Sequence, residues 1–123
     1  MDFETVRDRC LAKPETTEEF PFDEHTLVFK VCGKMFCLAN LERLPQSINV
    51  KCDPETAIDL RDRFEAVLPG WHMSKRHWNT VYFDDDAPDD AIEGWIDDSY
   101  NLVVKSLKKA DRLRIQAATG APS

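Results

Sequence analysis

The chain has 123 residues, of which 42% are hydrophobic and 32% are charged, and its formal net charge is −7. This length suits one domain with a two-layer core, and the acidity argues against strong nonspecific binding to duplex nucleic acid, whose phosphates attract basic surfaces. The first residues lack the basic start and apolar run of a signal peptide, and no apolar run nears the ~20 residues of a membrane helix. We therefore expect a cytoplasmic protein with no membrane partner.

The first half of the chain predicts one helix and three strands. Apolar residues at helical spacing predict a helix over residues 2–12, and a polar loop follows over residues 15–22. The two rings that flank Pro21 at the end of this loop are expected to anchor it to the core, with a ligand role as the alternative. Alternating apolar side chains predict strands over residues 26–32, 35–39 and 47–52. The last two strands are joined by a connection in which a proline prevents a helix. A tight turn at Gly33 and Lys34 joins the first two strands into a hairpin.

The second half predicts two helices on either side of a second hairpin. Asp53 and Pro54 form a strong helix start, and this helix is expected to run to Val67 before residues 68–70 stop it. Residues 70–73 and 78–83 are predicted strands, with a turn at residues 74–77. After an acidic loop, a third helix is expected to reach about residue 109 with Trp95, Ile96 and Tyr100 facing the sheet.

Together these elements predict an α+β domain over residues 1–110. The order α-β-β-β-α-β-β-α, with short turns between strands, implies a five-stranded antiparallel sheet, and three helices with one apolar stripe each should cover one face of it. Residues 111–123 begin with basic side chains and then become small, so we expect a flexible tail.

Chemical motifs are scarce. The sequence has no nucleophile motif, no phosphate-binding glycine loop and no paired metal ligands, so we expect no enzyme activity and no cofactor or metal. His72 and His77 near Asn79 leave acid–base chemistry as a minor alternative. The cysteines lack zinc-site spacing and are expected to be free thiols, with a disulfide or metal site as the alternative; they are Cys10, Cys32, Cys37 and Cys52.

The run from Gly70 to Val81 combines two tryptophans, two histidines and a Lys-Arg pair, and it resembles the signature of the bacterial YjbR/MmcQ-like family. One departure is Ser74, where asparagine is common in the family. Further matching segments extend the resemblance from about Glu4 to Lys109; they are residues 20–22, 27–31, 33–36, 51–55, 97–100 and 103–104. The resemblance implies a two-layer fold of the secretion-chaperone or CyaY-like kind, with a "double wing" of two hairpins and a DNA-binding role.

From this resemblance and the residue chemistry, the candidate nucleic-acid site centres on Lys75 and Arg76 at the tip of the second hairpin. Basic groups contact phosphate, and aromatic rings stack on unpaired bases. The remaining candidates flank this tip or lie on the other hairpin and its neighbouring strand; they are Trp71, His72, His77, Asn79, Lys30, Lys34 and Lys51.

Structural roles compete with this interpretation. Trp71 and Trp78 can be core residues, and Lys75 and Arg76 can be an ordinary solvated turn. The runner-up function is a protein- or peptide-interaction module that uses the sheet face or edge, for which the acidic run of residues 84–90 is a possible partner surface. Iron binding of the CyaY sort is disfavoured, because the strand at residues 26–31 offers no carboxylate beside Glu4 and Asp8. A monomer is expected.

Overall fold

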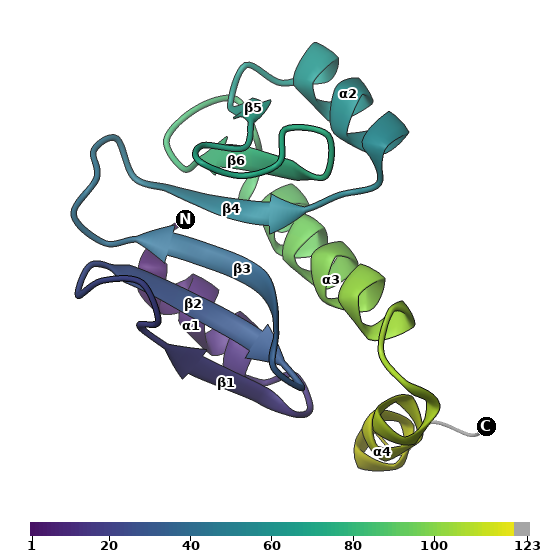
Figure 1. Ribbon diagram of the computed structural model, residues 1–123. Coiled ribbons are helices and arrows are strands. Elements are labelled where there is room, and N and C mark those ends of the chain that lie inside the picture. Colours follow the sequence, from purple (N-terminus) through teal and green to yellow (C-terminus); the bar gives the residue numbers. More distant parts are fainter. Residues whose placement is uncertain (120–123) are drawn as a thin grey trace.

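The computed structural model describes residues 1–119 and shows an α+β fold with one six-stranded antiparallel sheet (Figure 1). Strand order across the sheet is β1-β2-β3-β4-β6-β5. The strands are β1 (Thr16–Glu19), β2 (Thr26–Val31), β3 (Lys34–Asn40), β4 (Ser47–Lys51), β5 (Val67–Pro69) and β6 (Trp78–Tyr82). The helices are α1 (Phe3–Leu11), α2 (Pro54–Arg63), α3 (Asp89–Lys105) and α4 (Lys109–Thr119). The fold class is therefore as expected, but with one more strand and one more helix.

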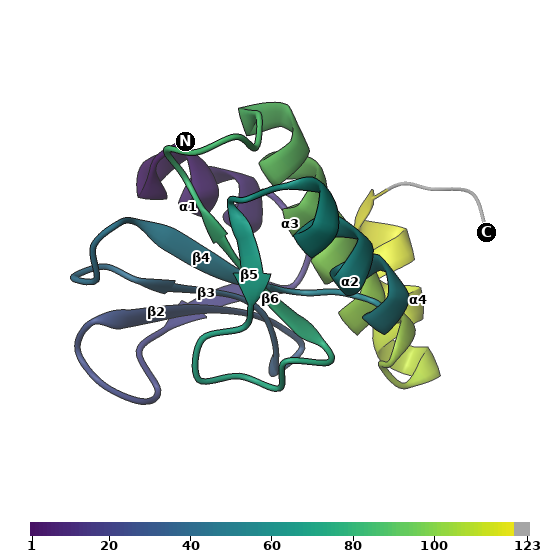
Figure 2. The same ribbon diagram turned by 90° about the horizontal axis from the view of Figure 1, so that it is seen from above.

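Helices and loops take opposite faces of the sheet (Figure 2). The main core lies between the sheet and the helices α1, α2 and α3, which contribute Val6, Leu60 and Ile96 among others. A second, smaller cluster of Val28, Leu38 and Trp78 lies on the other face, beneath the loop of residues 70–77. This second face carries most of the predicted functional residues.

The strand β1 was predicted as a loop because its four residues, Thr16–Glu19, are polar. It is an edge strand that pairs antiparallel with β2 along its length. Its side chains are held by ion pairs on both faces, Glu18 with Arg7 at 2.7 Å and Glu19 with Lys30 at 3.2 Å. Charged side chains are a common feature of edge strands, where they discourage pairing with another chain.

The predicted second helix was too long. It ends at Arg63, and Phe64 is already extended, with φ −129° and ψ 128°. The amides of Glu65 and Ala66 then donate to the carboxylate of Asp86, at 2.8 and 2.9 Å. This capping of the turn lets the chain run on as β5, which pairs with β6, so the hairpin begins three residues before the predicted position.

The predicted third helix ends earlier than expected, and a further helix follows it. The amides of Ser106 and Leu107 bond to carbonyls three residues earlier, which ends α3, and α4 begins at Lys109. Ile115 is buried in the main core, and Arg114 pairs with Glu15 at 2.8 Å. Residues 111–119, which were expected to begin a tail, form most of α4, and residues 120–123 of that expected tail lie outside the described part of the chain.

A serine hydroxyl separates the middle strands. The β3–β4 ladder pairs Cys37 with Val50, which places Phe36 opposite Lys51 at the next position. There the hydroxyl of Ser99 from α3 intervenes: it accepts from the Lys51 amide at 2.8 Å and donates to the Phe36 carbonyl at 2.5 Å. Beyond this point β3 curves away from β4, so these two strands no longer lie side by side over α3 (Figure 1).

Helix α1 is held to α3 by Asp97. Its carboxylate accepts from the Arg9 guanidinium at 3.1 and 2.5 Å and from the Lys13 ammonium at 2.5 Å. Burial alone would raise the pKa of Asp97, but the hydrogen bonds from Arg9 and Lys13 outweigh it and lower the pKa below the ordinary 3.8. The ionised form is thus favoured in the folded state.

We predict that Asp97→Asn destabilises the protein at neutral pH by on the order of 1–2 kcal/mol, because charged hydrogen bonds are lost. Since the folded pKa is depressed, the contribution of Asp97 is present above pH 3.8 and disappears as the pH falls through the folded value. Urea melts of both proteins at pH 7 and pH 3 measure the difference, which should shrink in acid. Asp98→Asn, at an exposed neighbour, is the control, and an equal loss at both pH values would contradict the assignment.

Candidate nucleic-acid interface

The face opposite the helices carries a groove that we call the basic groove, with a volume of about 550 Å³. Its cations are Lys30, Lys34 and Lys51, and its lining includes no carboxylate. Apolar side chains share the lining, namely Phe22, Met35 and Trp78. Val103 of α3 and Ser106, the residue after this helix, also reach the groove, because β3 and β4 separate above them.

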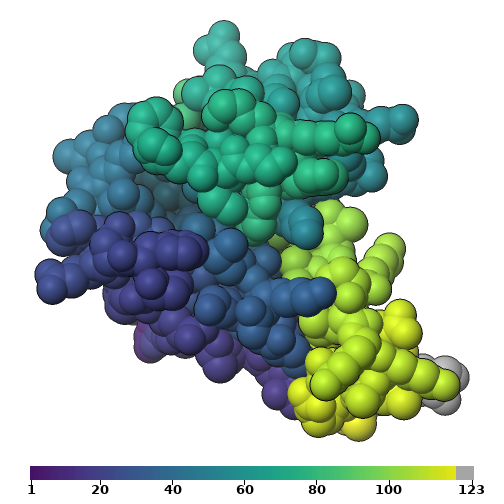
Figure 3. All heavy atoms as spheres, viewed as in Figure 1, coloured from purple at the N-terminus to yellow at the C-terminus, as the bar shows by residue number. Residues whose placement is uncertain are grey.

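Figure 3 shows the loops that stand on this face. The loop of residues 70–77 covers the upper part of the sheet, and residues 20–25 cover the lower left part. Phe22 is 64% exposed, although rings flanking Pro21 were expected to anchor the loop to the core. An exposed ring beside lysines suits stacking on an unpaired base.

The three lysines differ in their availability. The ammonium of Lys30 pairs with Glu19 at 3.2 Å, whereas that of Lys34 lies 3.4 Å from the Ser106 carbonyl. The Lys51 side chain forms no ion pair or hydrogen bond with any residue between 1 and 119. Lys51 and Lys34 are therefore the groove cations that can bind a ligand without losing an ion pair.

The 70–77 loop is held at both ends. The Trp71 amide donates to the Thr80 hydroxyl at 2.8 Å, and the Cys52 amide donates to the His77 carbonyl at 2.8 Å. The second bond places the end of the loop beside Lys51, the residue before Cys52. The loop thus continues the basic groove.

Within this loop the predicted cations have different surroundings. The Lys75 ammonium donates to the Gly70 carbonyl at 3.0 Å, so it folds back on its own loop. Exposed Arg76 has no hydrogen-bonding or ionic partner in the described chain. His72 and His77 are exposed, and the His72 backbone has a positive φ of 55°.

Trp71 belongs to a different cluster, which the sequence did not indicate. Its ring is 48% exposed and lies 3.9 Å from the Arg43 guanidinium carbon, while Arg43 also donates to the Tyr82 hydroxyl at 3.0 Å. Arg43 lies on the β3–β4 connection, far from Trp71 in sequence, so no local pattern could reveal this pair.

Asn79 is a predicted residue that lies on the other face of the sheet. It is only 1% exposed and faces α2, where it accepts from Arg61 Nε at 2.7 Å and donates to the Ala57 carbonyl at 3.3 Å. The alternation of β6 explains this, since Trp78 and Thr80 take one face and Asn79 takes the other. Asn79 therefore has a structural role here.

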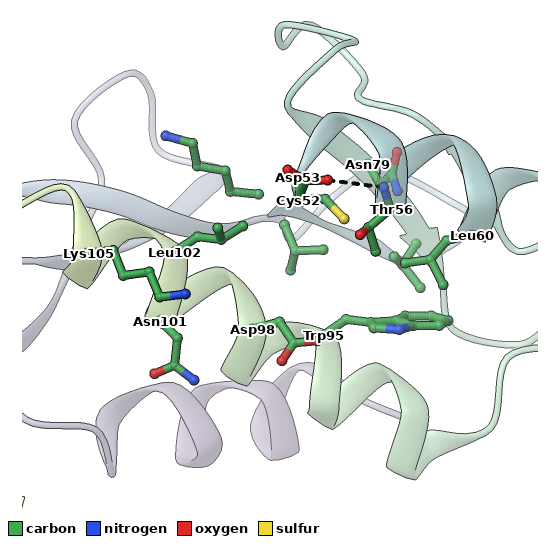
Figure 4. A pocket seen from close by; sticks show the side chains of 13 residues that line it. Cys52, Asp53, Thr56, Leu60, Asn79, Trp95, Asp98, Asn101, Leu102 and Lys105 are labelled. Carbon is green, nitrogen blue, oxygen red and sulfur yellow. Dashed lines mark hydrogen bonds between the residues drawn. The ribbon is translucent and has the colours of Figure 1, made fainter.

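A second hollow, of about 350 Å³, lies on the helix side between α2, α3 and the strands β4 and β6 (Figure 4). Its lining mixes apolar side chains with Cys52, Asp53, Asp98 and Lys105. Burial, with smaller effects from Asp53 and Asp98, raises the pKa of Cys52 to about 11, so this thiol is neutral near pH 7. We call this site the interhelical hollow.

Residues 1–119 contain no group of three or more histidine, cysteine or carboxylate residues that could hold a metal ion. None of the described helices is long and apolar enough to cross a membrane. All four cysteines are free thiols, as predicted.

Comparisons with known proteins identify relatives along nearly the whole chain. Residues 11–102 match the model of the YjbR family. The chain is 34% identical over 113 residues to the uncharacterized protein YbdF of Escherichia coli O157:H7, covering 92% of this chain and 93% of that one. It is 32% identical over 103 residues to the uncharacterized protein YjbR of Escherichia coli K12, covering 84% and 87%.

Solved structures have the same fold. The crystal structure of Deinococcus radiodurans protein DR2400 superposes with a TM-score of 0.85 at 35% identity, covering 98% of this chain and 88% of that one. A Pseudomonas syringae protein superposes with a TM-score of 0.70 at 25% identity, covering 83% and 98%. None of these names states an activity or a ligand.

Proposed function

The chain belongs to the YjbR family, and from this premise we propose that it is a non-enzymatic DNA-binding protein of the bacterial cytoplasm, with a preference for single strands. The observation that carries the proposal is the basic groove, in which three lysines and an exposed phenylalanine line one surface free of carboxylates. Lysines bind phosphates without regard to sequence, and rings stack on bases of any kind. The family resemblance adds the expectation of DNA as the partner.

Single strands fit this surface better than a duplex. Among the predicted cations of this face within residues 1–119, Lys34, Lys51 and Arg76 have no carboxylate partner and are not folded back onto the 70–77 loop as Lys75 is. Because the net charge is −7, a duplex would find few phosphate contacts. A single strand can also place an unpaired base on Phe22, which a duplex cannot offer. We expect weak binding, with a dissociation constant of about 10⁻⁴ to 10⁻⁶ M near physiological salt.

The prediction is that Lys34→Ala with Lys51→Ala weakens binding of a fluorescein-labelled single strand at least about tenfold at low salt, without loss of stability. Fluorescence anisotropy at several salt concentrations measures it, and three cations predict a log–log salt slope of about −2 for the natural sequence. The control variant, Arg7→Ala with Arg63→Ala, removes the same amount of charge from outside the groove. Its affinity for the single strand should fall less than that of the lysine double variant. Equal losses in both double variants would reject the groove.

Single substitutions in the 70–77 loop refine the site. Arg76→Ala should weaken binding more than Lys75→Ala, because the Lys75 ammonium is already bonded to Gly70 while Arg76 is free. The same titration with a duplex of equal length tests the preference for single strands. Absence of binding at low salt would overturn the proposed function.

The alternative is a peptide-binding module. Exposed apolar side chains at the other end of the sheet favour it, namely Leu44, Leu68 and Trp71 around the Arg43 cluster. Such exposed apolar groups are typical of protein contact sites. If DNA binding is absent, Trp71→Ala and Leu44→Ser become the variants with which to test a protein partner.

A further inference from the structure

The interhelical hollow has the size of a small-molecule site. Its volume of about 350 Å³ is near the lower end for ligand pockets. The strands β4 and β6 form its floor with Val50 and Val81, and the helices α2 and α3 form its walls. It lies on the helix side of the sheet, so it is separate from the basic groove, although Lys51 borders both.

One end of the hollow is apolar. Figure 4 shows the Trp95 indole and Leu60 at this end, and the Phe64 ring supports Trp95 from its edge, with centroids 5.2 Å apart. Trp95 was expected to pack on the sheet, yet it is only partly buried because one side of it lines the hollow. A tryptophan held in this way offers an apolar wall for a side chain of a ligand.

The rest of the hollow carries both signs of charge. Asp98 and Asp53 lie near its middle, and Lys105 lies at the end away from Trp95, beside Asn101 (Figure 4). Asp98 and Lys105 are two turns apart on α3 and share a face, about 10 Å apart along the axis. Neither forms an ion pair or hydrogen bond with another residue in the part of the chain described.

The hollow offers one free charge of each sign. The Asp98 carboxylate and the Lys105 ammonium have no partner in residues 1–119, the Asp53 carboxylate caps α2 through the amides of Glu55 and Thr56, and the Cys52 thiol is neutral. A purely anionic ligand would leave Asp98 facing a like charge and a purely cationic one would leave Lys105 so, whereas a zwitterion satisfies both. From the apolar end, the order along the hollow is apolar, acidic, basic.

We propose that the interhelical hollow binds a free apolar α-amino acid. The side chain of the ligand lies against Trp95 and Leu60, its ammonium faces Asp98, and its carboxylate faces Lys105. This site is independent of DNA binding in the basic groove.

Nuclear magnetic resonance tests the proposal through the Trp95 indole. The ¹⁵N-labelled protein shows one indole N–H resonance for each tryptophan, and Trp95→Phe identifies that of Trp95. L-phenylalanine at millimolar concentration should shift it. Three analogues should bind at least about fivefold more weakly, since each lacks one charge: 3-phenylpropionate, 2-phenylethylamine and L-phenylalaninamide.

Charge variants then distinguish the two ends of the ligand. Asp98→Asn should weaken binding of L-phenylalanine while leaving that of 3-phenylpropionate nearly unchanged, and Lys105→Met should weaken L-phenylalanine while sparing 2-phenylethylamine. Asp90→Asn and Lys108→Met are charge-matched controls outside the hollow. The proposal would be overturned if L-phenylalanine did not shift the Trp95 resonance, or if Asp98→Asn and Lys105→Met did not weaken its binding. Tighter binding of L-phenylalaninamide than of L-phenylalanine would also overturn it, in favour of a peptide N-terminus.

Discussion

Replacing Phe36 with alanine should destabilise the protein by about 3–5 kcal/mol, the loss typical of large-to-small changes in a core. Phe36 is 0% exposed and meets the Tyr100 ring edge-on, with centroids 5.2 Å apart and planes at 84°. Its position in β3 joins the sheet to α3, so no neighbouring element can close the resulting cavity without moving the helix. Urea denaturation, with m checked against the natural sequence, measures the loss.

The matched control is Phe22→Ala, because Phe22 is the same residue type but 64% exposed. Its effect on stability should be within about 0.5 kcal/mol, as for other surface changes. The same variant should weaken DNA binding if the protein has the proposed function, which assigns base stacking to Phe22. A Phe36→Ala loss below about 1 kcal/mol would show that β3 and α3 do not pack as described.

Arg61→Met should cost about 2–4 kcal/mol, because one side chain joins α2 to the 70–77 loop and β6. Arg61 Nε donates to Asn79 Oδ1 at 2.7 Å, and its Nη2 donates to the carbonyls of Lys75 and Trp78. Methionine keeps the length of the chain but leaves the buried Asn79 oxygen without this donor. Urea melts give the stability, and hydrogen exchange of loop amides should accelerate.

Arg63→Met, two residues further along α2, is the control. Arg63 pairs with Asp59 at 3.4 Å, but both side chains are about 60% exposed. Such a surface pair contributes less than about 0.5 kcal/mol. Similar losses for Arg61 and Arg63 would mean that the network around Asn79 carries little energy.

Elements with a strong apolar pattern could be predicted from sequence, and the others could not. The hairpin of β2 and β3 and the cap of α2 at Asp53 are confirmed because alternation and capping are local signals. β1 has no apolar side chain, and its pairing depends on the neighbouring strand and on ion pairs with Arg7 and Lys30. Tertiary contacts of this kind produce no recognisable pattern in the sequence of a short segment.

The candidate site was predictable only in its cations. Lys30 and Lys51 could be placed on polar strand faces and Lys34 in a turn, and all three line one groove. The same reasoning assigned Phe22 to an anchor in the core, because its exposure depends on the course of a loop, and it missed Arg43, which reaches Trp71 from a distant connection. The interhelical hollow was missed entirely, because Trp95 was expected to pack on the sheet and Asp98 shows no pattern that sets it apart from other surface carboxylates.

The Ser99 hydroxyl lies between β3 and β4 and so separates the sheet into two leaves of three strands, β1-β2-β3 and β4-β6-β5. The helix α3 packs against both leaves. β3 and β4 pair at two positions, whereas β4 and β6 pair at five, so the weakest seam of the sheet runs through its middle. A small rotation of one leaf about α3 would widen or narrow the seam without breaking another ladder. Because the basic groove passes over this seam, such a rotation would change the width of the groove between its lysines.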